Sequence, residues 1–125
     1  MNPVVVDTSA FAALAFQEPE GEAVARRLEG AQVFAPTLLR FELASVARKK
    51  ARRAPEQAPA IVSALSTALD GQWGIVWRDV DPADIVLIAQ ATGLTAYDAS
   101  YLWLAGTLGA ELVTLDARLA AACAD

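Results

Sequence analysis

Apolar residues occur along the chain in short blocks, separated by longer stretches in which they recur with helical spacing. The short blocks read as buried strands at 2–6, 32–35, 75–77 and 111–115. The intervening stretches predict helices at 8–16, 22–29, 36–53, 59–69, 82–93, 95–108 and from 117 to the terminus. Strands separated by one or two helices indicate an α/β fold with a short parallel sheet.

Length and composition limit the fold and its chemistry. The 125 residues, 55% of them hydrophobic, fit one compact domain over 1–125. No histidine is present, which excludes a Ser-His-Asp triad, a histidine base and a histidine-ligated zinc site. The single cysteine, Cys123, excludes an internal disulfide. Together with the absence of a signal-like N-terminus or a long apolar run, this favours a cytoplasmic protein.

Charge is unevenly distributed. Fifteen acids and ten bases give a net charge of −5, which argues against non-specific nucleic-acid binding as the main role. Five of the ten bases nevertheless lie between Arg48 and Arg53. This run is either a solvated helix end, favoured by the helix dipole, or a patch that binds a polyanion.

Two acids follow predicted strands. Asp7 follows the first strand and Asp116 the fourth. Because ligands bind at the carboxyl ends of parallel strands, these side chains are expected to converge on one crevice. Each also has a simpler interpretation as the N-cap of the next helix. Asp98 likewise completes a capping-box pattern that starts at Thr95.

Glu42 is harder to explain as a cap because it lies inside a predicted helix. Its helical neighbours at three and four residues are Leu38, Leu39, Ser45 and Val46, and none is cationic. A carboxylate on an apolar face requires a partner. That partner is either a metal ion or a cation from another element.

These acids form an all-oxygen set, which Mg²⁺ or Mn²⁺ prefers. Such an ion activates water and stabilises charge on phosphate oxygens, so metal-assisted phosphodiester hydrolysis fits the set. Removing Asp7, Glu42, Asp98 and Asp116 leaves eleven acids against ten bases, which would place most of the net charge in this site. Lys49 and Arg53 lie within roughly 20° of Glu42 around the helix, about 10 and 16 Å along it, and are candidates to bind RNA phosphates.

Four segments together resemble the PIN-domain ribonucleases, and among them the VapC-type toxins of bacterial toxin–antitoxin pairs. They are Val4 to Ala10, the Leu-Leu-Arg-Phe-Glu-Leu helix around Glu42, Tyr97 to Ala105, and Leu112 to Leu119. The resemblance implies a three-layer α/β/α sandwich and an endoribonuclease that leaves 5′-phosphate and 3′-hydroxyl ends.

The same resemblance implies roles for individual residues and partners. Asp7 and Asp98 would be principal Mg²⁺ or Mn²⁺ ligands, while Glu42 and Asp116 would bind metal or orient water. Hydroxyls that support these acids would come from Thr8, Ser9 and Thr114, although each also fits an ordinary helix-start or strand-end hydrogen bond. A homodimer and a cognate antitoxin protein are typical of the family.

One departure and two alternatives accompany this interpretation. Many relatives have a further strand after the last helix, so we expect four or five strands here, and with four strands one edge of the sheet is open to a partner. A catalytically silent PIN-like binding module is the first alternative. An aspartate-nucleophile phosphatase is the second, although Ser9 stands where that enzyme class usually has another Asp. The residues Phe11, Phe16, Trp73, Trp77, Tyr101 and Trp103 are expected to pack in the core or at an interface rather than to stack on bases.

Overall fold

A parallel four-stranded sheet forms the centre of the computed structural model, which describes residues 1–124. The strand order is β3-β2-β1-β4, and each pairing is parallel. The strands are β1 (Pro3–Val6), β2 (Gln32–Pro36), β3 (Val76–Arg78) and β4 (Glu111–Val113). β1 is central, and its residues Val4, Val5 and Val6 are buried, as expected for a strand covered on both faces.

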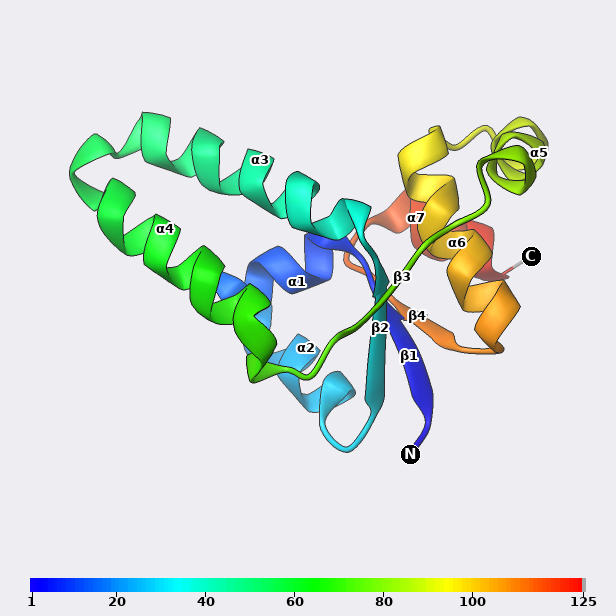
Figure 1. The fold of residues 1–125 in the computed structure, drawn as a ribbon, viewed down its shortest axis with the longest axis horizontal. Helices are drawn as coiled ribbons and strands as arrows, with labels where there is room; N and C mark the ends of the chain where they lie inside the picture. Colours follow the sequence, from blue (N-terminus) through cyan, green and yellow to red (C-terminus); the bar gives the residue numbers. More distant parts are fainter. Residues whose placement is uncertain (125) are drawn as a thin grey trace.

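Helices connect the strands and cover both faces of the sheet (Figure 1). One layer contains α1 to α4 and the other α5 to α7, which gives the expected α/β/α sandwich. The helix bounds are α1 (Thr8–Ala15), α2 (Gly21–Leu28), α3 (Leu38–Arg53), α4 (Ala58–Thr67), α5 (Pro82–Thr92), α6 (Ala96–Leu108) and α7 (Ala117–Ala124). Short turns η1 (Pro55–Gln57) and η2 (Ala68–Gln72) flank α4.

The boundaries differ from the sequence prediction in two places that matter. Pro36 is the last residue of β2, paired with Arg78, rather than the first turn of a helix. A proline fits there because β3 is short and the strand ends at this point. β4 ends at Val113, two residues earlier than predicted, so Asp116 lies in a loop rather than directly after the strand. Asp125, to which the last predicted helix extended, lies outside the described residues.

The core lies between the sheet and both helix layers. Phe11 of α1, Leu39 and Leu43 of α3 and Tyr101 of α6 are among its largest fully buried side chains. Phe16, Trp73, Trp77 and Trp103 are half-buried and pack against this core, which confirms the packing interpretation for these aromatics. No helix within residues 1–124 is both long and apolar enough to cross a membrane.

Candidate active site

The candidate site lies where the connections of the sheet change direction. Strands β1, β2 and β3 succeed one another toward one edge, whereas β4 lies on the other side of β1. The carboxyl ends of β1 and β4 therefore flank the topological switch point, the usual ligand site of an open parallel sheet. Asp7 follows β1, and the loop carrying Thr114 and Asp116 follows β4.

Asp7 is a buried carboxylate held by several donors. Its side chain caps the N-terminus of α1 and accepts the Ala10 backbone N–H at 3.0 Å, which confirms the capping interpretation of Asp7. The Ser9 hydroxyl lies 2.8 and 3.0 Å from the two carboxylate oxygens, and the Thr114 hydroxyl donates to Oδ2 at 2.5 Å. Burial raises the pKa of Asp7 despite these donors, and the nearby negative charge of Asp116 raises it further.

Two hydroxyls tie Asp7 to the loop after β4. The Ser9 hydroxyl accepts the Leu115 N–H at 2.9 Å, and the Thr114 hydroxyl accepts the Asp116 N–H at 3.0 Å. Each hydroxyl accepts an N–H group of the loop and donates to the Asp7 carboxylate, which when ionised can only accept. These contacts fix the loop beside Asp7, so the end of β1 and the start of α7 form one unit.

Two further acids lie at the starts of helices. Asp116 precedes α7, and Asp98 lies at the start of α6. Asp116 accepts the N–H groups of Arg118 and Leu119 at 2.8 and 3.1 Å, as an N-cap does. Asp98 lies in the first turn of α6, where its own N–H donates to the Thr95 hydroxyl. Burial raises the pKa of Asp98, and the charge of Asp116 raises it further, while Arg118 opposes the change. Asp7, Asp98 and Asp116 therefore share one electrostatic environment, with Asp116 acting on both others.

Glu42 belongs to a second cluster, in which its partners are hydroxyl groups. The Thr8 hydroxyl donates to Glu42 Oε1 at 2.8 Å, and the Tyr101 hydroxyl donates to the same oxygen at 2.5 Å. Among residues 1–124, Glu42 forms no salt bridge. Neither a metal nor a cation is thus needed to explain its position on α3. Because Thr8 follows Asp7 directly, the two clusters are neighbours at the end of β1.

Tyr101 is the residue of this site that sequence reasoning assigned only to packing. It is buried, as predicted, yet its hydroxyl joins α6 to Glu42 of α3. Burial and the hydrogen bond to Glu42 raise the pKa of Tyr101 well above its usual range, so it remains a donor. The available signal was its spacing: Tyr101 lies one helical turn after Asp98.

The donor set fits a hard divalent cation in its chemistry, since it consists of carboxylate and hydroxyl oxygens. Burial raises the pKa of Asp7 and of Asp98, and the negative charge of Asp116 raises both further, whereas a bound cation would act in the opposite direction. In the described chain, however, no three acidic or cysteine side chains are close enough together to form a ready-made metal site. In this conformation the hydroxyls and backbone N–H groups hold the acids individually.

The basic run from Arg48 to Arg53 forms the C-terminal end of α3. Lys49 and Arg53 are exposed, and together with Arg52 they line a shallow hollow of 350 Å³. Arg53 also lines a second hollow with Gln57 of η1. Lys50 differs from them because its ammonium group lies 3.0 Å from Glu18. Lys49 and Arg53, the two predicted contacts to RNA phosphates, are therefore both open to solvent.

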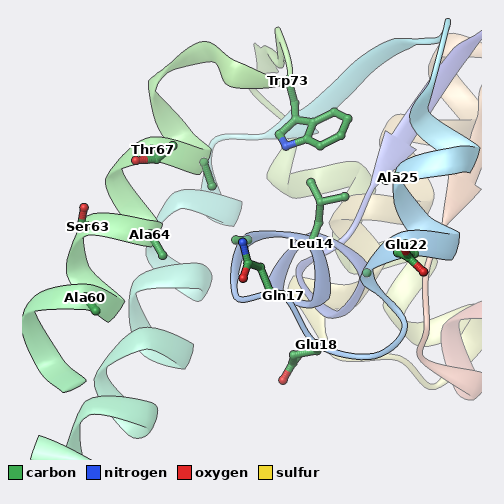
Figure 2. Close-up of a pocket in the computed structure, with 13 residues that line it drawn as sticks. Leu14, Gln17, Glu18, Glu22, Ala25, Ala60, Ser63, Ala64, Thr67 and Trp73 are labelled. Carbon is green, nitrogen blue, oxygen red and sulfur yellow. The ribbon is translucent and has the colours of Figure 1, made fainter. Parts of the chain in front are cut away.

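A separate groove lies between α4 and the α1–α2 pair (Figure 2). It has a volume of 670 Å³ and is lined mostly by small side chains, with Trp73 and Leu14 facing each other at one end. None of the four candidate acids lines it. This groove is therefore distinct from the site at the end of β1.

The sequence matches the PIN domain family over residues 4–124. It is 33% identical over 121 residues to Ribonuclease VapC3 of Pyrobaculum aerophilum, covering 94% of this chain and 92% of that protein.

Two solved structures share the fold. The crystal structure of PAE2754 from Pyrobaculum aerophilum has a TM-score of 0.77 at 28% identity, covering 97% of this chain and 86% of that one. VapC20 of Mycobacterium tuberculosis, a toxin that cleaves the sarcin-ricin loop, has a TM-score of 0.67 at 17% identity, covering 95% and 94%. On the extent of the family match and of the identity to Ribonuclease VapC3, this chain belongs to the PIN domain family.

Proposed function

We propose that this protein is a metal-dependent endoribonuclease that hydrolyses RNA phosphodiester bonds. The observation that carries the proposal is the buried carboxylate of Asp7 at the switch point of the sheet, with Asp98 and Asp116 close enough to act on one another electrostatically. A protein does not gain stability from gathering like charges in a half-buried place. The ribonuclease name of the curated relative and the toxin name of the structural relative support the choice of RNA as substrate.

The residues divide into ligands and supports. Asp7, Asp98 and Asp116 would hold Mg²⁺ or Mn²⁺, with Glu42 as a further ligand or as the group that orients water. When bound, the metal supplies an activated water and stabilises charge on the phosphate oxygens. Ser9 and Thr114 keep the two oxygens of Asp7 oriented, and Thr8 and Tyr101 do the same for Glu42. A cation bound beside Asp7 would favour the charged form of this carboxylate, so no separate base is needed to deprotonate it.

The alternatives have less support from the site. An aspartate-nucleophile phosphatase usually has a second Asp where this chain has Ser9, and the Ser9 hydroxyl instead donates to the Asp7 carboxylate that would be the nucleophile. A silent binding module would account for the hydrogen bonds that hold Asp7, Glu42 and Asp116, but not for the placement of Asp98 where the charge of Asp116 acts on it. We therefore retain the silent module only as the outcome expected if the protein neither binds metal nor cleaves RNA.

We further propose the biological setting that the relatives suggest. The chain would be the toxin of a toxin–antitoxin pair, inhibited by a cognate antitoxin protein, homodimeric and cytoplasmic. The names of Ribonuclease VapC3 and of the VapC20 toxin support the first part of this proposal. Co-expression with the neighbouring reading frame, followed by co-purification and a growth assay, tests it.

The direct test is sequencing of 5′-phosphate RNA ends after incubation of RNA with the purified protein and Mn²⁺. We expect discrete new ends with the wild type, and none with EDTA or with Asp98→Asn. Asp70→Asn, which neutralises an exposed acid in η2, is the matched control and should cleave like the wild type. Full cleavage by Asp98→Asn, or undiminished cleavage in EDTA, would contradict the proposal.

A further inference from the structure

Two aromatic side chains are unusually exposed, and each directly precedes an acid of the site. Phe41 is 73% exposed and precedes Glu42, while Tyr97 is 65% exposed and precedes Asp98. The chain has nine aromatic residues, four Phe, three Trp and two Tyr, and the other seven are buried or half-buried. Phe41 and Tyr97 therefore do not pack in the core of this chain, unlike the other seven aromatic residues.

The hydrogen bonds of the site place Tyr97 at its rim. Tyr101 donates to Glu42 from α6, so this face of α6 looks toward α3. Tyr97 lies four residues earlier on the same face, about 6 Å closer to the N-terminus of α6. It therefore lies at the open end of the contact between α3 and α6, beside Asp98.

Phe41 approaches the same rim from α3. It precedes Glu42 by one residue, about 100° around the helix, on the solvent side. Arg40 lies about 100° further around α3, with its guanidinium 4.6 Å from the centre of the Trp77 ring of β3, so Phe41 lies between this flank of α3 and the flank that carries Glu42. Phe41 and Tyr97 thus border the acids from two different elements.

Electrostatics explains why such residues would be useful. The protein carries a net charge of −5, and its candidate site gathers acids that repel a phosphodiester. Attraction of phosphates by the basic end of α3 acts at some distance from these acids. Stacking of an aromatic ring on a nucleobase supplies affinity that does not depend on charge or on base identity.

We propose that Phe41 and Tyr97 stack on unpaired nucleobases that flank the scissile phosphate, and so hold single-stranded RNA over the acids. This inference rests on the proposed ribonuclease function, and it requires unpaired bases at the site, since bases in a duplex cannot present their faces. The two residues position the substrate and take no part in the bond cleavage.

Binding assays test this without requiring cleavage. Anisotropy of a labelled, short, single-stranded oligoribonucleotide of mixed sequence is measured in Ca²⁺, with its intactness checked on a gel. We expect Phe41→Leu and Tyr97→Leu, which remove the ring but keep an apolar side chain, each to weaken binding about 5- to 150-fold. Phe41→Tyr and Tyr97→Phe keep the ring and should bind like the wild type. Leu87→Ala, on the exposed face of α5, is the control for loss of an unrelated apolar side chain.

An oligonucleotide of the same length with abasic units isolates the stacking contribution. The wild type should bind the abasic oligonucleotide more weakly than the mixed-sequence RNA. The Leu variants should bind the abasic oligonucleotide as the wild type does. Equal binding of the mixed-sequence RNA by wild type and Leu variants overturns the inference, as does an equal loss with the abasic oligonucleotide. If the Leu variants keep RNA affinity but lose a co-expressed protein partner, the rim is a protein interface and the inference is wrong.

The outcomes also separate this inference from the proposed function. Ring-dependent RNA binding by a protein that cleaves nothing supports the stacking surface and contradicts the nuclease. If the protein cleaves RNA with a bound metal but its RNA affinity is unchanged by the loss of either ring, the nuclease is supported and the stacking surface is contradicted.

Discussion

Replacing Tyr101 with Phe removes one oxygen atom from the middle of the site. The ring is buried and remains in place, so the substitution leaves no large cavity. The lost group is a hydroxyl that donates to the Glu42 carboxylate at 2.5 Å and lies 2.8 Å from the Thr8 hydroxyl. The variant therefore probes the hydrogen bond between α6 and α3 almost in isolation.

The expected loss of stability follows from these contacts. A hydrogen bond to a charged group contributes about 1.5–3 kcal/mol to the free energy of unfolding. Thr8 still donates to the same oxygen, and Glu42 is only half-buried, so water replaces part of the lost interaction. We therefore expect Tyr101→Phe to lower the free energy of unfolding by about 1–2 kcal/mol.

Urea unfolding at neutral pH measures this change, and Tyr97→Phe is its matched control. Tyr97 lies one turn earlier on α6 and is largely exposed, so the same chemical change there should leave stability within about 0.5 kcal/mol. If both variants unfold at the same urea concentration, the Tyr101 hydrogen bond contributes nothing and the reasoning fails. A Thr8→Ala, Tyr101→Phe double-mutant cycle should give a coupling energy of about 0.5 kcal/mol or more, because both hydroxyls donate to one oxygen.

Three other variants and additions test the site. Burial raises the pKa of Asp7 above 3.8, so the folded state keeps this proton where the unfolded chain has lost it, and stability falls as pH rises through the raised value. Asp7→Asn should therefore be more stable at neutral pH by about 0.5–2 kcal/mol, with a flatter pH dependence in urea titrations, and lower stability there would contradict this. Mn²⁺ at about 100 times its Kd should stabilise the wild type by about 2.7 kcal/mol in thermal melts, with no effect on Asp98→Asn and an unchanged effect on the exposed-acid control Glu56→Gln. Replacing Lys49 and Arg53 by Ala should reduce the log–log salt slope of single-stranded RNA binding by about 1.4, whereas Lys50→Ala, whose ammonium already pairs with Glu18, should change it less.

The sequence was informative where local chemistry decides structure. Short β-branched and apolar runs located the strands, and Asp81-Pro82 and Thr95 located the starts of α5 and α6, because caps act within one turn. It was less informative where the outcome depends on distant contacts. Thr114, which the sequence placed in the fourth strand, lies beyond the end of β4, where its hydroxyl donates to Asp7, a residue 107 positions away. The partners of Glu42 come from α1 and α6, and no spacing along α3 could reveal them.

The hydrogen bonds also explain why the acids among the described residues do not form one ready-made metal site. Asp7 and Asp116 each cap a helix, and Glu42 is bonded by two hydroxyls, so every one of these carboxylates has partners of its own. Such partners keep the fold intact while Asp98 and Asp116 repel one another. A cation that enters must compete with these partners, so its affinity reflects the difference between two sets of interactions. The Thr114 hydroxyl also orients the Asp7 carboxylate, so removing this donor should weaken both the fold and Mn²⁺ binding. Thr114→Val, which keeps the shape of the side chain, should show both changes in thermal melts and Mn²⁺ titrations, and a variant that loses stability but binds Mn²⁺ as tightly as the wild type would show that the hydroxyl does not orient the metal ligand.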